Sequence, residues 1–143
     1  FIPIHYHGEP VSWTTRSTGT DGIRYRSAKP HEEKIHHKHL LYGEDYLRHS
    51  VIVVEGPIDV WRIGPGAVCT FGTSYSRQQV LRLSRYPQRV VAFDSDYEAQ
   101  RRAESLCHEL SAFPGRTQRV EIDAKDPGSA SKREIRLLKE SFL

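Results

Sequence analysis

VIVVEG at residues 51–56 and VVAFDSD at residues 90–96 are the stretches that decide the fold. Each is a nearly continuous apolar run without alternation, which predicts a strand buried on both faces of a parallel sheet. Each run also ends in carboxylates. Because open α/β sheets place their sites at the carboxyl ends of their strands, we expect Glu55, Asp94 and Asp96 to meet at one sheet edge.

From residue 51 onward, predicted strands and helices alternate. Strands are expected at 51–55, 67–71, 89–93 and 118–122, and helices at 57–63, 76–86, 97–113 and from 131 onward. The third of these helices has apolar residues at three- and four-residue spacing, as a helix packed on a sheet requires. Four strand–helix repeats in about 90 residues predict an α/β fold with a compact parallel sheet and helices on both faces.

Residues 1–50 have a different character. Short extended segments at 1–4, 9–16 and 22–26 are separated by turn formers, which predicts two or three small antiparallel strands. A polar, histidine-rich stretch follows, in which we expect a short helix or turn. We therefore divide the chain into a small basic subdomain, residues 1–50, and an α/β domain, residues 51–143.

The composition is that of a soluble globular protein, with 37% hydrophobic and 27% charged residues. The formal net charge is +3, with both signs interspersed, so charge alone is a weak indication of a polyanionic partner. No apolar run approaches the ~18 residues that cross a membrane, so no membrane partner is expected. The chain starts at Phe1 and contains no methionine, which indicates a piece of a longer protein.

The D-x-D pair at Asp94 and Asp96 has two interpretations. Residues two apart in an extended stretch point the same way, and oxygen-only ligands suit Mg²⁺ or Mn²⁺ rather than zinc. Alternatively, the pair simply caps the helix that begins at Tyr97. The glutamate-glycine at Glu55 and Gly56, which ends another buried strand, favours the metal interpretation.

These motifs together resemble the topoisomerase–primase (Toprim) domain. VVEGPIDVW (53–61) and VVAFDSDYEAQRRA (90–103) are similar to its glutamate-glycine and D-x-D elements. The primase branch is the closer match, through AVCTFGTSYS (67–76) and the K-D-P motif (125–127). The stretch 1–50, with its RYRS and HKHLLYG elements, resembles the basic subdomain that precedes Toprim in bacterial and phage-type primases.

The resemblance implies a Toprim-type four-stranded, mainly parallel sheet flanked by helices, preceded by a small β-rich basic subdomain. It implies a DNA primase-like RNA polymerase core, which makes short RNA primers on a single-stranded DNA template from ribonucleoside triphosphates. Catalytic residues would be Glu55, Asp94 and Asp96. Ligands for Mg²⁺ or Mn²⁺ would be Glu55, Asp94, Asp96 and Asp126. Glu55 would be either a metal ligand or a general acid/base, and Asp59 would orient the ligands.

Basic residues in family-like segments would contact the nucleotide or the DNA backbone. These residues are Arg16, Arg24, Lys38 and Lys125. The resemblance also implies a cytoplasmic location in a bacterial or phage-infected cell, and a replicative helicase that binds through regions absent from this chain.

Two other functions stay open. A Toprim nuclease would use the same acids to cleave phosphodiesters. A non-catalytic module would bind nucleic acid or a replication partner, because Gly128 stands where the K-D-P motif of the family continues into a second acid. That departure leaves Asp126 without its usual neighbour.

Two further features have a structural interpretation. His36, His37 and His39 lack the i, i+4 spacing of a helical ligand pair and have no cysteine partner, which favours a solvated polar segment over a metal site. Trp61 is at helical spacing from Ile58, which predicts a place in the core.

Overall fold

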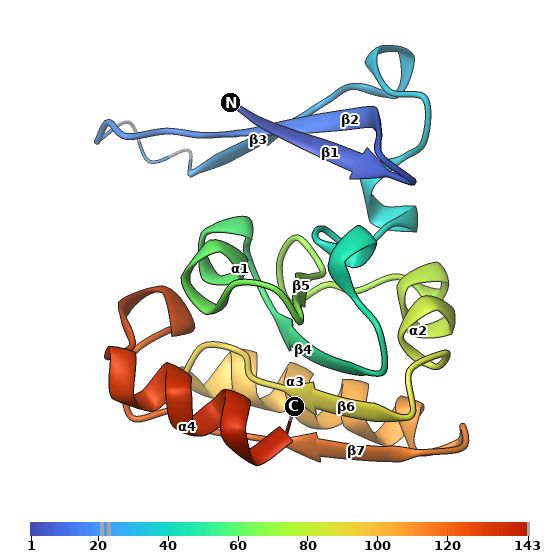
Figure 1. Ribbon diagram of the computed structural model, residues 1–143. Helices are drawn as coiled ribbons and strands as arrows, with labels where there is room; N and C mark the ends of the chain where they lie inside the picture. The colour runs from blue at the N-terminus through green and yellow to red at the C-terminus, as the bar shows by residue number, and fades with distance from the viewer. Residues whose placement is uncertain (21, 23, 143) are drawn as a thin grey trace.

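The computed structural model describes residues 1–20, 22 and 24–142, and of residue 142 the backbone only. It contains two sheets that lie one above the other (Figure 1). The upper sheet is antiparallel, in the order β1 (Ile2–Tyr6), β2 (Glu9–Arg16) and β3 (Tyr25–Ser27). It corresponds to the three expected extended segments, although Ile23 of the third lies outside the described residues.

The lower sheet is parallel throughout. Its strands are β4 (Ser50–Val54), β5 (Ala67–Cys69), β6 (Gln88–Val91) and β7 (Arg116–Arg119), in the order β5-β4-β6-β7. The predicted fold class is confirmed. Strand β6 ends earlier than predicted, but the Ala92 N–H still donates to the carbonyl oxygen of Val53 at 2.9 Å, so the central pairing extends beyond it.

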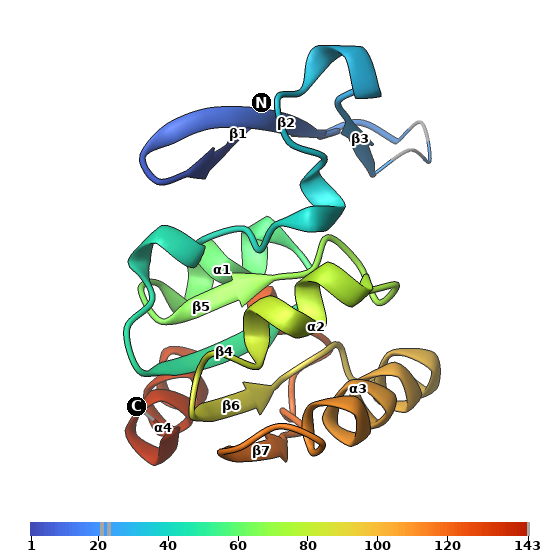
Figure 2. The ribbon, with the colours of Figure 1, turned by 90° about the vertical axis from the view of Figure 1, so that its right-hand side faces the viewer.

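Two helices cover each face of the parallel sheet (Figure 2). The helices are α1 (Pro57–Ile63), α2 (Arg77–Leu83), α3 (Tyr97–Leu110) and α4 (Lys132–Phe142). Val51 and Val53 of β4 pack in the cluster with α2 and α3, whereas Ile52 and Val54 pack in the cluster with α1 and α4. Because successive side chains of a strand point to opposite faces, a strand covered on both sides needs the continuous apolar run seen here.

Trp61 is not in the core, contrary to the prediction. Its side chain is 55% exposed, and its indole N–H donates to the Tyr42 hydroxyl at 2.8 Å. The buried residues of α1 are Pro57, Val60 and Ile63. Trp61 follows Val60 directly, so it lies about 100° around the helix from the buried stripe.

The segment between the sheets contains short 3₁₀ turns, η1 (Pro30–Glu32), η2 (His37–His39) and η3 (Glu44–Tyr46). It is fastened to the parallel sheet by polar contacts. Buried Gln79 donates from Nε2 to the carbonyl oxygens of Leu40 and Thr70, and Tyr42 forms an antiparallel bridge with Cys69. Within the described residues, no helix combines the length and the apolar character that a membrane crossing needs.

Arg89 is a charged residue inside the fold, with only 1% of its surface exposed. Its guanidinium donates at 2.8 to 3.4 Å to Thr117 Oγ1 and to the carbonyl oxygens of Ser84, Tyr86, Leu110, Phe113 and Pro114. Several of these carbonyls end α2 and α3, where the helix dipoles favour a cation. Arg89 therefore fixes the ends of two helices against the sheet.

Candidate metal and nucleotide site

The carboxyl ends of the parallel strands open into a cavity of about 420 Å³. Glu55 follows β4, Asp94 follows β6, and Asp126 precedes the 3₁₀ turn η4 (Pro127–Ser129). The cavity is lined by Thr14, Arg16, Arg24, Tyr25, Ser27, Glu55, Gly56, Pro57, Ile58, Asp59, Phe71, Gly72, Asp94, Asp126, Gly128 and Ser129. The structure therefore brings four of the five predicted acids to one cavity.

Asp94 has a buried carboxylate oxygen without a partner. Its backbone N–H donates to Glu55 Oε1 at 3.0 Å, but no described residue hydrogen-bonds to its Oδ1. Burial raises the pKa of Asp94 from 3.8 to about 7, and neighbouring carboxylates, Glu55 first among them, add to the rise. A buried, unpaired carboxylate oxygen is costly unless a proton or a cation satisfies it.

Gln100 holds the backbone at Asp94 and was missed by the sequence analysis. Its Nε2 donates to the Asp94 carbonyl oxygen at 2.8 Å, and Arg119 donates to its Oε1 at 2.6 Å. The residue is 8% exposed, on the apolar side of α3. The signal was available, because Gln100 is a polar residue next to the buried positions Ala99 and Ala103.

Asp59 connects two parts of the acid cavity. Its Oδ2 accepts the N–H of Gly56 at 3.1 Å, and its Oδ1 accepts the N–H of Gly128 at 2.9 Å. Burial raises the pKa of Asp59. A Cβ added at Gly128 would lie 2.9 Å from Asp59 Oδ1 and 3.3 Å from Asp126 Oδ1. A side chain at position 128 would therefore have to displace the Asp59 carboxylate that makes this hydrogen bond.

Asp96 does not line the cavity. It is exposed, and its Oδ1 accepts the N–H of Ala99 at 3.0 Å. Asp96 is thus the N-cap of α3, the contact that the capping interpretation of the D-x-D pair expects. Its charge still raises the pKa of Glu55, after the larger effect of burial. Asp126 has a similar local bond, from the Ser129 N–H to its Oδ1 at 2.7 Å.

The potential metal ligands of the cavity fit a divalent cation that prefers oxygen. The acids at the cavity offer carboxylate oxygens, and none of the lining residues is a histidine or cysteine. Asp94 presents a buried oxygen to which no described residue donates a hydrogen bond. Mg²⁺ and Mn²⁺ take such ligands, whereas a zinc site prefers nitrogen and sulfur.

The antiparallel sheet supplies the opposite wall of the cavity. Arg16 and Arg24 line it, and the guanidinium of Arg16 donates to the Tyr25 hydroxyl at 2.9 Å and lies 4.9 Å from the centre of its ring. Thr14 and Ser27, also missed by the sequence analysis, line this wall with their neighbours in β2 and β3. Two cations thus face the acids across the cavity.

The other two predicted basic residues are placed elsewhere. Lys38 is partly buried, and its Nζ donates to the carbonyl oxygens of Thr70, Phe71 and Ser74 at 2.8 to 2.9 Å. Its ammonium therefore holds the loop after β5. Lys125 is exposed, and its carbonyl oxygen accepts from both the N–H and the hydroxyl of Ser95. Neither residue lines the cavity.

Comparison with known proteins relates this chain to the Toprim-like family and to a DNA primase. The model of the Toprim-like family matches residues 52–131. A DNA primase from Synechococcus elongatus is 33% identical over 133 residues, an alignment that covers 82% of this chain. The aligned part is 19% of the length of that primase.

Solved structures share the fold over nearly the whole chain. The Aquifex aeolicus primase, crystallised with its zinc-binding and RNA polymerase domains, superposes with a TM-score of 0.83 at 21% identity, covering 99% of this chain and 40% of that one. The E. coli primase catalytic core superposes with a TM-score of 0.74 at 20% identity, covering 100% of this chain and 51% of that one. At these identities the likeness establishes a shared fold.

Proposed function

The chain belongs to the Toprim-like family, and we propose that it is a primase-type RNA polymerase core that makes short RNA primers on single-stranded DNA. The observation that carries this proposal is the cavity between the two sheets. Carboxylates of Glu55, Asp94 and Asp126 line one side, and the guanidinium groups of Arg16 and Arg24 line the other. Nucleotidyl transfer needs both, because the triphosphate is anionic and the reacting oxygens require a bound cation.

The acids are proposed to bind Mg²⁺ or Mn²⁺, the kind of ion that Toprim domains typically hold. The proposed ligands are Glu55, Asp94, Asp96 and Asp126. When bound, the ion would neutralise triphosphate charge and activate the primer 3′-hydroxyl. Glu55 accepts the Asp94 N–H through Oε1, so its Oε2 is the atom proposed to hold either the ion or a proton.

The remaining residues of the cavity are proposed to orient the substrates. Arg16 and Arg24 lie where they can contact the phosphates of the incoming ribonucleotide or of the template, with Tyr25 fixing the Arg16 side chain. Asp59 holds the turns that carry Gly56 and Gly128 at the acid side. Lys125, which is exposed, remains a proposed contact for nucleic acid, whereas Lys38 is proposed to act by shaping the loop after β5.

A primer-synthesis assay tests the proposal. The chain is incubated with single-stranded DNA, ribonucleoside triphosphates and Mg²⁺ or Mn²⁺, and incorporation is followed on a gel. We expect incorporation that requires the metal and that disappears when Asp94→Asn and Asp96→Asn are combined. Asp123→Asn is the matched control, because Asp123 is an exposed acid outside the cavity.

Two results would point to the other functions. Nicking of DNA with metal but without nucleoside triphosphates would identify a nuclease that uses the same acids. DNA binding without incorporation, together with feeble Mn²⁺ binding, would identify a non-catalytic module. Incorporation that persists in the Asp94→Asn and Asp96→Asn variant would refute the proposed site.

A further inference from the structure

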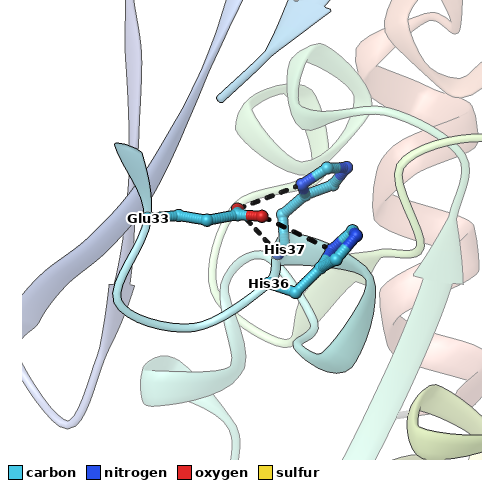
Figure 3. A group of neighbouring side chains, drawn as sticks. All are labelled: Glu33, His36 and His37. Atoms are coloured by element: carbon cyan, nitrogen blue, oxygen red, sulfur yellow. Dashed lines mark hydrogen bonds and ion pairs between the residues drawn. The ribbon is translucent and has the colours of Figure 1, made fainter. Parts of the chain in front are cut away.

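A second group of potential metal ligands lies in the segment between the two sheets, outside the acid cavity. Glu33, His36 and His37 each offer one ligand atom, and these atoms all lie within 4.8 Å of one another. In Figure 3 the Glu33 carboxylate extends toward both imidazole rings, which come from successive residues at the start of η2. The group is therefore formed by local backbone geometry over five residues.

The two histidines approach different oxygens of the same carboxylate. His37 Nδ1 lies 3.3 Å from Glu33 Oε2, and His36 Nδ1 lies 3.7 Å from Glu33 Oε1. The Glu33 side chain is only 3% exposed and that of His37 only 12%, whereas that of His36 is 44% exposed. The prediction of a solvated polar segment is thus wrong for His37, whereas His36 keeps a path to solvent.

The carboxylate is held in place by bonds from outside the histidine pair. The Ser12 hydroxyl of β2 donates to Glu33 Oε2 at 2.6 Å, and the His37 backbone N–H donates to the same oxygen at 3.1 Å. Such bonds to a ligating carboxylate orient it, as they do around metal sites. The Glu33 carboxylate is therefore oriented toward the two histidines before any ion binds.

The contact between His36 and Glu33 has no proton between the two facing atoms. The Lys38 backbone N–H donates to His36 Nδ1 at 3.1 Å, so in this arrangement Nδ1 carries no proton and cannot donate to Glu33. At 3.7 Å, Glu33 Oε1 then faces the electron-rich nitrogen of an imidazole. A cation at His36 Nδ1 would need the lone pair that now accepts the Lys38 N–H, so binding would exchange that hydrogen bond for coordination by both atoms.

We propose that Glu33, His36 and His37 bind a transition-metal ion of the zinc type, with solvent completing the coordination. Two imidazoles and one carboxylate are a ligand set that suits Zn²⁺, Co²⁺ or Ni²⁺. The set differs from the oxygen-only acids of the cavity, so the two sites would select different ions.

A bound ion would also restrain the loop after β5, which forms part of the wall of the acid cavity. The residue after His37 is Lys38, whose Nζ holds the carbonyl oxygens of Thr70, Phe71 and Ser74. The His37 ring also packs edge-on against the Phe71 ring, with centroids 5.5 Å apart, and Phe71 lines the cavity. The proposed site therefore lies in direct contact with the loop that bounds the candidate site.

Cobalt titration tests the proposal, because Co²⁺ bound by nitrogen ligands absorbs visible light. The titration is done in the Asp94→Asn and Asp96→Asn background, which weakens Co²⁺ binding by the acid cavity. We expect a saturable visible band that is lost when His36→Asn and His37→Asn are added. Ser12→Ala, which removes the orienting hydroxyl, should weaken Co²⁺ affinity about tenfold. His31→Gln is the matched control, because His31 is an exposed histidine in the neighbouring turn η1.

Equal Co²⁺ spectra with and without the two histidines would overturn the proposal, as would the absence of any saturable band in the parent chain. Loss of native circular dichroism in the double-histidine variant would move the test to Glu33→Gln, which keeps the size of the side chain. In that variant we expect at least a tenfold loss of affinity, and unchanged affinity would again overturn the proposal.

Discussion

Replacing Asp94 by asparagine should stabilise the metal-free protein while removing its response to Mn²⁺. Among the described residues, none hydrogen-bonds to the buried Oδ1 of Asp94, and burial together with nearby carboxylates raises the pKa of Asp94 from 3.8 to about 7. Without a metal ion, ionising this group in the folded state is therefore unfavourable. Asparagine keeps the shape of the side chain and removes the charge.

The magnitude and its pH dependence follow from the pKa. The full shift converts to about 4 kcal/mol at 1.36 kcal/mol per unit, and since Asp94 is only partly buried, solvent screening reduces this to roughly 1–2 kcal/mol. The folded-state pKa is raised, so the folded chain binds more protons than the unfolded chain between about pH 4 and 7. Stability is consequently lost as pH rises through this window, and the penalty is complete above pH 7.

Thermal unfolding in EDTA at pH 8 and pH 5 measures the effect. For a chain of this length, 1–2 kcal/mol corresponds to a rise in Tm of about 3–6 °C in Asp94→Asn at pH 8. At pH 5 less than half of the difference should remain. Asp123→Asn, an exposed acid in a nearby turn, should change neither value.

Added Mn²⁺ should raise the Tm of the parent chain and leave that of Asp94→Asn nearly unchanged. The reasoning is refuted if Asp94→Asn lowers the Tm at pH 8 in EDTA, because the carboxylate would then be a stabilising group rather than an unsatisfied one. It is also refuted if the stabilisation is larger at pH 5 than at pH 8.

Three other substitutions probe contacts described above. Arg89→Met should cost at least about 3 kcal/mol in urea unfolding, since several buried carbonyl groups lose their donor; a loss below about 1 kcal/mol would contradict this. Lys38→Met should destabilise the chain by about 1–3 kcal/mol through the loop after β5, whereas a purely nucleotide-binding lysine would leave stability unchanged. Gly128→Ala should weaken Mn²⁺ affinity about tenfold, measured by calorimetry, because its Cβ displaces the Asp59 carboxylate; unchanged affinity would show that the turn adjusts freely.

The parallel sheet was predictable because its signal is local. Residues 51–54 of β4 are all apolar and buried, and a strand with such a run has to be covered on both faces, which the two core clusters confirm. Helix beginnings were equally local: Ser76 caps α2 through the Gln79 N–H, and the side chain of Gln79 returns to the Ser76 N–H. Strand ends were less predictable, since apolar residues such as Phe93 continue past the last ladder residue of β6.

The candidate site was only partly predictable, because it depends on contacts between distant residues. The sequence shows a lysine at position 38 after two histidines. It does not show that the ammonium of this lysine reaches carbonyl groups more than 30 residues away. The bond between Asp59 and the Gly128 N–H is of the same kind. The Glu33 cluster escaped prediction for another reason, since its spacing belongs to a 3₁₀ turn and to a loop rather than to a helix.

The segment that joins the two sheets is fastened at η3 to elements on both sides of it. Asp45 accepts the N–H groups of His7 and Gly8 at 2.9 and 2.8 Å, which ties η3 to the turn between β1 and β2. Glu44 in the same turn pairs with Arg82 of α2 at 2.9 Å. Neighbouring side chains of one 3₁₀ turn thus contact the β1–β2 turn and helix α2. We infer that these contacts, with the small apolar cluster around Leu40, help to set the distance from the arginines to the acids. We therefore expect a change at Asp45 to act on the cavity indirectly, since Asp45 does not line it.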